Sequence, residues 1–427
     1  MNNRTLLPVL AGTVLLAGVT VVHADSAEVL PKGIFQLGST VYFYDDIKKR
    51  YDPDGDKEDL AVDYNGALDS SVFPALAALD PSVPSGTANI GDSVVDFEFE
   101  YTTAEFELFY GVTDKLSLGI KVPYFDAKNK VSATVDSSTA NVGKNTLYLS
   151  GLQPPQLDKS PVIPLGVPGA EVPGAEVMSD EDVQNLLGNG VDVNGDGTVD
   201  INGLKYDRFE SSDNSGIGDI ELKGKYKYYD QGDWRLAAEG GVRLSTGEED
   251  DPDNLTDLAL GTGHDAILAK LYNDYRGIDK VLLSATLEYT YFLETDKNLR
   301  IPRDVNEPIT DNKENVDRDL GDILEVNLSG VYQFTPEWSA GLKYEFWQKP
   351  KNDIDGDEGF NYKSLEDETD KSSHSAIVGL SYSTIQRYRN NTAKVPLIAG
   401  IAYRDRCDGK NNVNVSKYIS AHLSLFL

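Results

Sequence analysis

A nine-residue segment near the middle of the chain has the residue types and spacing of a calcium-binding loop. The segment runs from Asp192 to Asp200 and reads DVNGDGTVD. In an EF-hand-type loop, side-chain oxygens at alternate positions and one backbone carbonyl bind the ion, and a glycine permits the sharp turn. The candidate ligands are Asp192, Asn194, Asp196, Thr198 (through its carbonyl) and Asp200.

The twelfth position of this loop departs from the calcium pattern. A bidentate acid is usual there, and this chain has Gly203. The site would then be weak, or would borrow a carboxylate such as Asp207. The preceding residues 179–187 (SDEDVQNLL) predict a capped helix leading into the loop. The alternative is an acidic turn without a metal, and calcium is the one cofactor that the sequence suggests. Residues 52–56 and 353–357 are shorter echoes, each a solvated turn or part of a cation-rich outer surface.

A second set of candidate residues lies in the stretch from Gly216 to Gly247. Apolar and charged residues alternate along it, which predicts a β-hairpin with a turn at Asp230–Asp233 and two opposite faces. The charged residues are Asp219, Glu221, Lys223, Lys225, Lys227, Arg235, Glu239 and Arg243. If this face lines a lumen, it forms either a charged constriction that selects solutes or a ladder of salt bridges that fills a narrow barrel.

Residues for catalysis are sparse. The pair His264–Asp265 could form a dyad, but no serine signature accompanies it, and a surface pair without a role is the simpler interpretation. We therefore expect no catalytic residues, and a hydrolase is the weakest of the functions considered.

The composition indicates the location of the protein and excludes some classes of partner. Residues 1–24 have a positive start, an apolar run and a small-x-Ala end, which predicts a signal peptide. No later stretch is long and apolar enough for a membrane helix, so an exported chain in a membrane must span it as a barrel. The net charge of −31 argues against nucleic acid as a partner, because phosphate contacts need clustered Lys and Arg. The single cysteine, Cys407, excludes an intramolecular disulfide.

Alternating segments recur along the whole chain. They predict twelve strands, at residues 31–46, 94–110, 115–125, 216–230, 234–247, 264–271, 280–294, 320–334, 338–348, 373–386, 394–406 and 412–427. The connections alternate between short turns and long acidic segments. The long insertions are residues 45–93, 126–215, 247–262, 295–319 and 351–371. Short turns on one side and long loops on the other are typical of outer-membrane barrels.

Aromatic residues also flank the short turns, as Tyr110, Trp234 and Trp338 do. Rings at strand ends suit a membrane interface, although Tyr and Trp favour strands in any sheet. The expected fold is therefore all-β: a transmembrane, antiparallel, up-and-down β-barrel of about twelve strands, formed by residues 25–427, with long extracellular loops.

Four segments are similar to a known family. They are LPKGIFQLGS (30–39), YGVTDKLSLGIKVPY (110–124), GIGDIELKGKYKYYD (216–230) and VRLSTGEED (242–250). They resemble the outer-membrane proteins linked to the meta-cleavage pathway of phenol degradation. The resemblance implies a channel or transporter-like barrel and supplies no catalytic residues.

The expected function is passive passage of small, hydrophobic or aromatic solutes across the outer membrane of a Gram-negative bacterium. The alternative is a structural or interaction barrel, a sheath or docking platform for a periplasmic or surface partner. The expected partners are outer-membrane lipid and lipopolysaccharide, small solutes, and the outer-membrane assembly machinery. That machinery would recognise the amphipathic last strand, which ends in Phe426 and Leu427.

Overall fold

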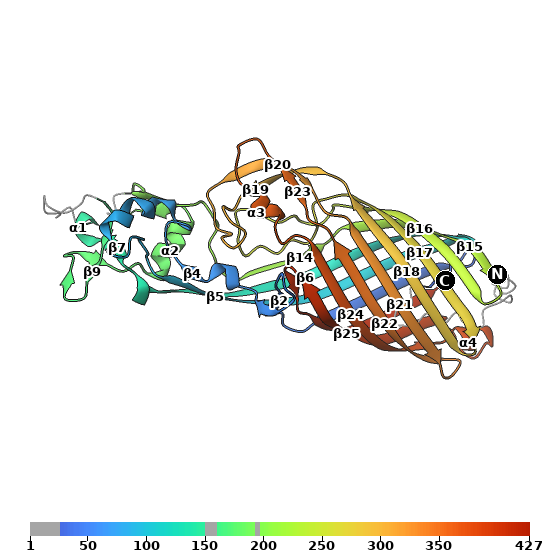
Figure 1. Cartoon of the computed structure of the whole chain (residues 1–427). Helices are drawn as coiled ribbons and strands as arrows, with labels where there is room; N and C mark the ends of the chain where they lie inside the picture. The colour runs from blue at the N-terminus through green and yellow to red at the C-terminus, as the bar shows by residue number, and fades with distance from the viewer. Residues whose placement is uncertain (1–25, 150–159, 193–196) are drawn as a thin grey trace.

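The computed structural model describes residues 26–149, 160–192 and 197–427. The predicted signal peptide, and Asn194 and Asp196 of the predicted calcium loop, lie outside these residues. The molecule is elongated, with a β-barrel at one end and a smaller head at the other (Figure 1). No helix among the described residues is long and apolar enough to cross a membrane.

The barrel is one antiparallel sheet that closes on itself. Its twelve strands are β1 (Phe35–Tyr44), β5 (Asp92–Thr113), β6 (Leu116–Asp136), β15 (Ile220–Gln231), β16 (Trp234–Leu244), β17 (Ala266–Ile278), β18 (Val281–Phe292), β21 (Ile323–Gln333), β22 (Trp338–Lys349), β24 (Lys371–Ser383), β25 (Leu397–Lys410) and β27 (Lys417–Phe426). Two short strands, β4 (Gly66–Ala67) and β14 (Ser212–Ile217), pair with β5 and β6. Closure comes from β1, which pairs with both β27 and β5. The predicted fold class is confirmed.

The two faces of the wall have opposite character. Leu342 and Ile401 on the outer face are 62% and 58% exposed, whereas Ser420 and Ser424 on the inner face are buried. Successive side chains of a strand point to opposite sides, so each strand contributes an apolar row outside and a polar row inside. The hairpin of β15 and β16 follows this pattern, with Val242 exposed and Arg235 buried.

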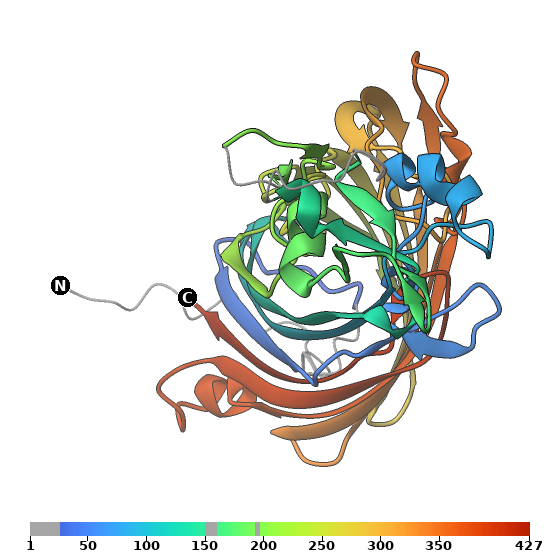
Figure 2. The same cartoon turned by 90° about the vertical axis from the view of Figure 1, so that its left-hand side faces the viewer.

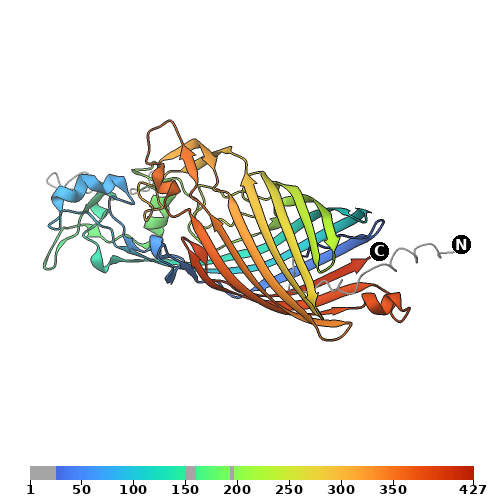
Figure 3. The ribbon, with the colours of Figure 1, turned by 45° about the vertical axis from the view of Figure 1, so that its right-hand side comes forward.

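The strands connect by tight turns at the end of the barrel that lies away from the head (Figure 3). Between β15 and β16 only Gly232 and Asp233 remain unpaired, and Gly232 has a φ of 58°, which glycine adopts without steric cost. One connection at this end is longer: α4 (Ile385–Arg389) lies between β24 and β25. The C-terminus is also here, where the amide of Phe35 donates to the carbonyl of Leu427.

Two predicted strand ends stop seven or more residues too early. The structure extends the third strand, predicted to end at residue 125, to Asp136, and the sixth strand, predicted to end at residue 271, to Ile278. As a result β5 and β6 form a hairpin of 22 and 21 residues that projects beyond the rest of the barrel. The insertion predicted at 126–215 therefore begins and ends with paired strands.

The insertions at 45–93 and 126–215 are not simple loops, since together they build the head. Strands β2 (Lys49–Tyr51) and β3 (Lys57–Asp59) of the first insertion pair with each other beside the mouth of the barrel (Figure 1). The elements of the head are η1 (Val62–Tyr64), η2 (Pro74–Ser82), η3 (Ser137–Thr139), β7 (Val142–Asn145), α1 (Thr146–Leu149), β8 (Val162–Pro164), β9 (Gly166–Val167), β10 (Ala170–Glu171), β11 (Ala175–Glu176), α2 (Asp180–Leu187), β12 (Gly190–Val191) and β13 (Ile201–Asn202). These short pieces are too small to be stable alone and depend on shared packing.

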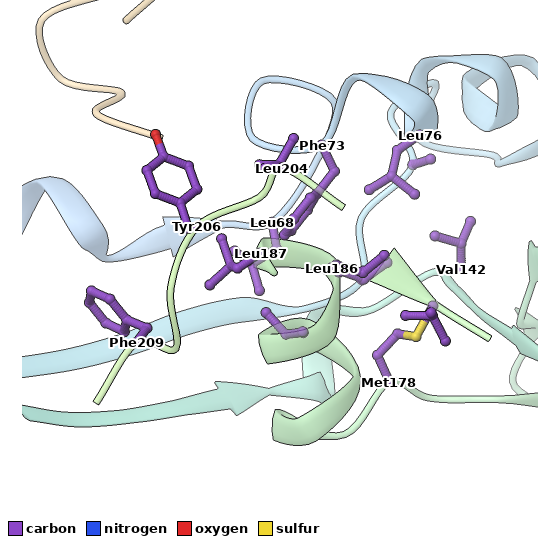
Figure 4. Close-up of a cluster of buried hydrophobic side chains, with 14 of the residues drawn as sticks. Leu68, Phe73, Leu76, Val142, Met178, Leu186, Leu187, Leu204, Tyr206 and Phe209 are labelled. Atoms are coloured by element: carbon purple, nitrogen blue, oxygen red, sulfur yellow. The ribbon is translucent and has the colours of Figure 1, made fainter. Parts of the chain in front are cut away.

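The head has its own hydrophobic core (Figure 4). Leu68 and Phe73 from the first insertion pack with Met178, Leu186 and other buried side chains from the second. Helix α2, which the sequence predicts, begins at a capping box in which the Ser179 side chain accepts from the Asp182 amide and Asp182 accepts from the Ser179 amide. The core shows that residues far apart in sequence form one compact unit at the tip of the long hairpin.

The insertions at 295–319 and 351–371 form a second, smaller outer unit. It consists of β19 (Thr295–Arg300), β20 (Lys313–Asp319), β23 (Asp353–Asp355) and α3 (Lys363–Glu366), and β20 pairs with both β19 and β23. Ile301, Val316 and Ile354 are buried between them. A short strand near the C-terminus, β26 (Val413–Asn414), pairs with β2. Figure 2 views the molecule from the head side, with the head in front of the barrel wall.

Candidate functional site: the barrel lumen

Residues 26–34, which we call the N-terminal strap, run along the inside of the wall at the end of the barrel away from the head. Asp274, a fully buried carboxylate, accepts from the Ser26 hydroxyl (2.7 Å) and the Ala27 amide (3.0 Å). Ala27 is buried against Ala237 and Tyr272 of the inner face. The strap therefore occupies part of the lumen at this end.

Ionic contacts reinforce the strap. The carboxylate of Glu28 pairs with Arg235 and, at 3.6 Å, with Lys227, and the Lys225 ammonium donates to the Ser26 carbonyl. Gly111 provides the room in which the strap joins β1, because a Cβ there would lie 2.0 Å from the Pro31 carbonyl oxygen. Three of the residues that the sequence nominated for the lumen wall thus contact the strap.

Three further charged residues of the β15–β16 hairpin form ion pairs nearer the head end of the wall: Glu221, Lys223 and Arg243. Glu221 is surrounded by the cations of Lys223 (2.6 Å), Arg243 (2.8 Å) and Lys121 (3.5 Å). Lys121 also reaches Glu105 at 3.1 Å. A carboxylate held by three cations is internally compensated. These contacts favour the salt-bridge ladder over a free charged constriction.

Two nominated residues have other surroundings. Asp219 lies at the outer end of the hairpin, where it accepts from the amides of Gly247 (3.1 Å) and Thr262 (2.9 Å) and so holds the outer connection. Glu239 is the register partner of Lys225 and Lys270, so its row alternates in charge across three strands.

Other strands of the wall carry further ion pairs. Glu345 receives Arg404 at 3.1 Å and Lys343 at 3.5 Å, and Lys270 pairs with Glu288 at 2.8 Å. The lumen is thus lined by compensated charges on several strands.

Aromatic rings also face the lumen, and the sequence analysis did not nominate them. Tyr418 lies between Tyr42 and Tyr44, with ring centroids 5.1 Å from each, and the Tyr42 hydroxyl donates to Glu105 at 2.8 Å. The alternation of β1 could have identified Tyr42 as a lumen residue. It is next to the lipid-facing Phe43, and successive side chains of a strand point to opposite faces. Rings beside charged groups give the lumen an apolar, π-rich strip along which an aromatic solute can lie.

Basic residues gather near the outer mouth of the lumen. Lys349 and Lys371 are direct register partners across β22 and β24, and Arg318 of β20 lies within electrostatic range of both. In the described part of the chain, none of the three has a carboxylate oxygen within 4.0 Å. Carboxylates at longer range partly offset this cluster, since Asp370 lies within electrostatic range of Lys349, and Asp250 and Glu249 of Arg318.

The predicted calcium loop lies in the head, far along the chain from the lumen wall. Of its five candidate ligands the structure describes Asp192, Thr198 and Asp200. The Asp192 carboxylate accepts from the Gly197 amide at 2.8 Å, and Asp200 accepts from the Tyr148 hydroxyl at 3.3 Å. Calcium binding stays a prediction.

The other acidic motifs have local explanations. In the 52–56 segment the Asp52 carboxylate accepts from the amides of Asp54 and Asp56, which closes a turn. The 353–357 segment begins with strand β23. Within the described residues, one group of carboxylates converges, Asp46 with Glu98 and Glu100, and Lys48 and Lys130 pair with it.

The His264–Asp265 pair does not form a dyad. The His264 ring is buried and lies 3.0 Å from the Leu293 carbonyl, while Asp265 accepts from the Ser245 amide and hydroxyl. Burial lowers the pKa of His264, which keeps the ring neutral. Both side chains therefore fix the connection between β16 and β17.

Comparison with solved structures supports the architecture. An outer membrane channel from Pseudomonas putida F1 matches with a TM-score of 0.51 at 12% identity, over 94% of this chain and 98% of that one. A FadL homologue from Pseudomonas aeruginosa (TM-score 0.35, 13% identity, 92% and 90% covered) and a toluene transporter from Ralstonia pickettii (0.34, 11%, 94% and 91%) match less well. Scores this low do not establish a common fold, so only the first comparison bears on the architecture.

Comparison of sequences identifies the family. No curated protein sequence matches the chain. The family described as "Putative MetA-pathway of phenol degradation" matches residues 170–384, which is 215 of the 427 residues and so half of the chain. This match agrees with the resemblance seen in the strands and turns. The chain belongs to this family of phenol-degradation-linked proteins, and its fold is that of an outer-membrane β-barrel.

Proposed function

We propose that the protein is a passive channel in the outer membrane for small, uncharged apolar or aromatic solutes. The observation that carries the proposal is the strip of rings formed by Tyr42, Tyr44 and Tyr418 inside a closed barrel whose ionic groups are mostly paired with one another. A hydrophilic solute would find few free charges along this wall, whereas an aromatic solute can stack on the rings. The similar Pseudomonas putida F1 protein is described as an outer membrane channel, which agrees with this function.

The environment of the barrel follows from the same proposal. Outer-membrane lipid and lipopolysaccharide would cover the outer face, on which apolar residues such as Leu342 and Ile401 are exposed. The assembly machinery would recognise β27, which pairs with both β1 and β25.

Uptake into proteoliposomes tests the proposal. The full mature chain is reconstituted, and entry of toluene, phenol and a disaccharide is followed against protein-free vesicles prepared with a slow-permeating lipid mixture. We expect faster entry of the two aromatic solutes and no change for the disaccharide. Equal rates with and without protein for all solutes would contradict the proposal and favour the alternative, a docking platform.

We also propose that residues 192–200 bind calcium and order this part of the head. The support is the spacing of oxygen-bearing residues, together with the helix α2 that leads into the segment. Chelation should increase proteolysis between residues 180 and 205, and added calcium should restore protection. Cleavage that is unchanged by chelator and by calcium would contradict it.

A further inference from the structure

The head contains a cavity that belongs to neither the barrel lumen nor the predicted calcium loop. Its volume is about 330 Å³, within the range of sites for small ligands. The long hairpin of β5 and β6 forms one wall, helix α2 forms a second, and residues 306–309 of the outer connection form a third. The apolar lining includes Val72, Val95, Val135, Val183, Leu187 and Phe209. A small apolar molecule would exchange water contact for these side chains.

The lining includes the phenol side chain of Tyr64. Tyr64 borders the cavity, and no hydrogen bond of its hydroxyl is found in the described part of the chain. Its ring is fixed by Phe97 (centroids 5.2 Å apart, edge to face) and by Phe209 (5.6 Å). Burial raises the pKa of Tyr64 well above its ordinary value, so the group stays a neutral hydroxyl. Such a hydroxyl can donate a hydrogen bond to, or accept one from, a ligand that carries its own hydroxyl.

The charges around the cavity exclude anionic ligands. Four carboxylates border it, those of Asp63, Asp69, Asp180 and Glu307, and the lining contains no basic residue. The nearby Arg50 is already paired with Asp63 at 2.6 Å. A carboxylate ligand would meet like charges without compensation, whereas an uncharged ligand would not.

A continuous series of rings joins this cavity to the lumen. From Phe97 it continues to Phe99 (6.2 Å) and Tyr101 (6.2 Å) along β5. Tyr101 then lies 6.3 Å from Tyr44 of the lumen strip. These distances fall within the range of contacting aromatic pairs, so each ring touches the next.

We propose that the head cavity captures a small, uncharged aromatic molecule bearing a hydroxyl group, and that the aromatic series from Phe97 to Tyr44 leads it to the lumen. The inference rests on the proposed channel function, since it names the substrate class and the route by which it arrives. Capture would keep a dilute solute at the cell surface close to the lumen. The arrangement also explains why β5 and β6 continue so far beyond the membrane: they hold the cavity and carry the ring series.

Saturation-transfer NMR tests whether the cavity binds ligands. Phenol, toluene and benzoate are the probes, and the full-length protein is kept in detergent. We expect binding of phenol and toluene and none of benzoate. Val183→Trp fills the cavity and should weaken binding of both, leaving only the contribution of the lumen rings, whereas Val167→Trp, at an exposed position of the same head, should change neither. Tyr64→Phe keeps the ring and removes the hydroxyl. This substitution should weaken the binding of phenol by about 2- to 10-fold, the effect of one hydrogen bond, and leave the binding of toluene unchanged. Phenol binding that is equal in all four proteins would overturn the capture site.

Uptake into proteoliposomes then separates this inference from the channel function. Phe99→Ala removes one ring of the series and should slow phenol entry without changing binding in the head. If phenol binds the head but never enters any vesicle, the channel function fails and the capture site stands. If phenol enters equally through the unchanged protein, Val183→Trp and Phe99→Ala, the channel stands and the inference fails.

Discussion

The barrel wall and the head use the same apolar side chains in opposite ways. In the wall, large apolar residues such as Leu342 and Ile401 point outward, and buried positions are polar, as at Ser373 and Ser424. In the head, Leu186 and Phe73 point inward, as in a water-soluble domain. The hydrophobic effect removes apolar side chains from water in both regions. In the wall they are covered by lipid, and in the head they are covered by one another. The membrane boundary therefore lies along the β5–β6 hairpin, between the lipid-facing rows and the head.

The largest expected effect comes from placing a charge on each type of apolar surface. Leu342→Arg should destabilise the barrel by about 2–4 kcal/mol, because the residue faces the hydrocarbon region. Val62→Arg makes the same kind of change at an exposed apolar residue of the head, where water solvates the new charge, and should be nearly neutral. Unfolding in urea with the protein in phospholipid vesicles measures both. Equal losses of unfolding free energy in the two variants would contradict the proposed difference between wall and head.

A comparable effect is expected from a void in the head. Leu186→Ala should cost about 2–4 kcal/mol of head stability, because the side chain is 5% exposed and packed in the core. Limited proteolysis should release fragments from residues 45–93 and 126–215, while the barrel keeps its heat-modifiable mobility on denaturing gels. Loss of that barrel mobility would show that head and wall fold as one unit.

Releasing the N-terminal strap should have a moderate effect on the wall alone. Asp274→Ala removes the acceptor for Ser26 and Ala27 and should cost about 1–3 kcal/mol, since several buried donors lose their partner. Glu288→Ala is the matched control, a lumen acid paired with Lys270. Proteolysis from the N-terminus should become faster in the first variant and not in the second. The same rate in both would mean that Asp274 does not hold the strap.

The smallest effect concerns pH and the connection between β16 and β17. Burial places the folded pKa of His264 below the ordinary 6.5, so the unfolded chain binds the proton more tightly. Stability from this group is therefore present above pH 6.5 and lost as the pH falls below it. Cleavage within residues 247–262 should increase between pH 7.5 and pH 5, and His264→Phe should remove part of that dependence. A pH response that is identical in the variant would exclude His264 as its source.

The sequence predicts the wall well and the head poorly, for a physical reason. A strand that faces lipid on one side must alternate strictly, and residues 281–291 do so, so β18 could be placed within about two residues. In the head, the apolar residues Leu68, Phe73 and Met178 follow no period, because they come from short, irregular pieces. Their common core depends on contacts between distant segments, which a local pattern does not reveal.

The extension of β6 was missed for a related reason. Residues 126–136 (DAKNKVSATVD) have a short apolar row, Val131, Ala133 and Val135, which faces the core of the head and is flanked by polar residues. Their strand is specified by pairing with β5. For the lumen, parity identified the charged side chains, but the ion pairs and the strap required the closed structure. Tyr42 points to the lumen side of β1. The alternation of that strand was enough to predict it as a lumen residue.

Single-channel conductance in planar bilayers tests most directly whether the strap-narrowed lumen is the route through the protein. The unchanged chain, Asp274→Ala and Glu288→Ala are compared in the same salt. We expect a small conductance for the unchanged chain, a larger one for Asp274→Ala, and little change for Glu288→Ala. If no protein conducts, with or without calcium, or if all three conduct equally, the lumen narrowed by the strap is not the route through the protein.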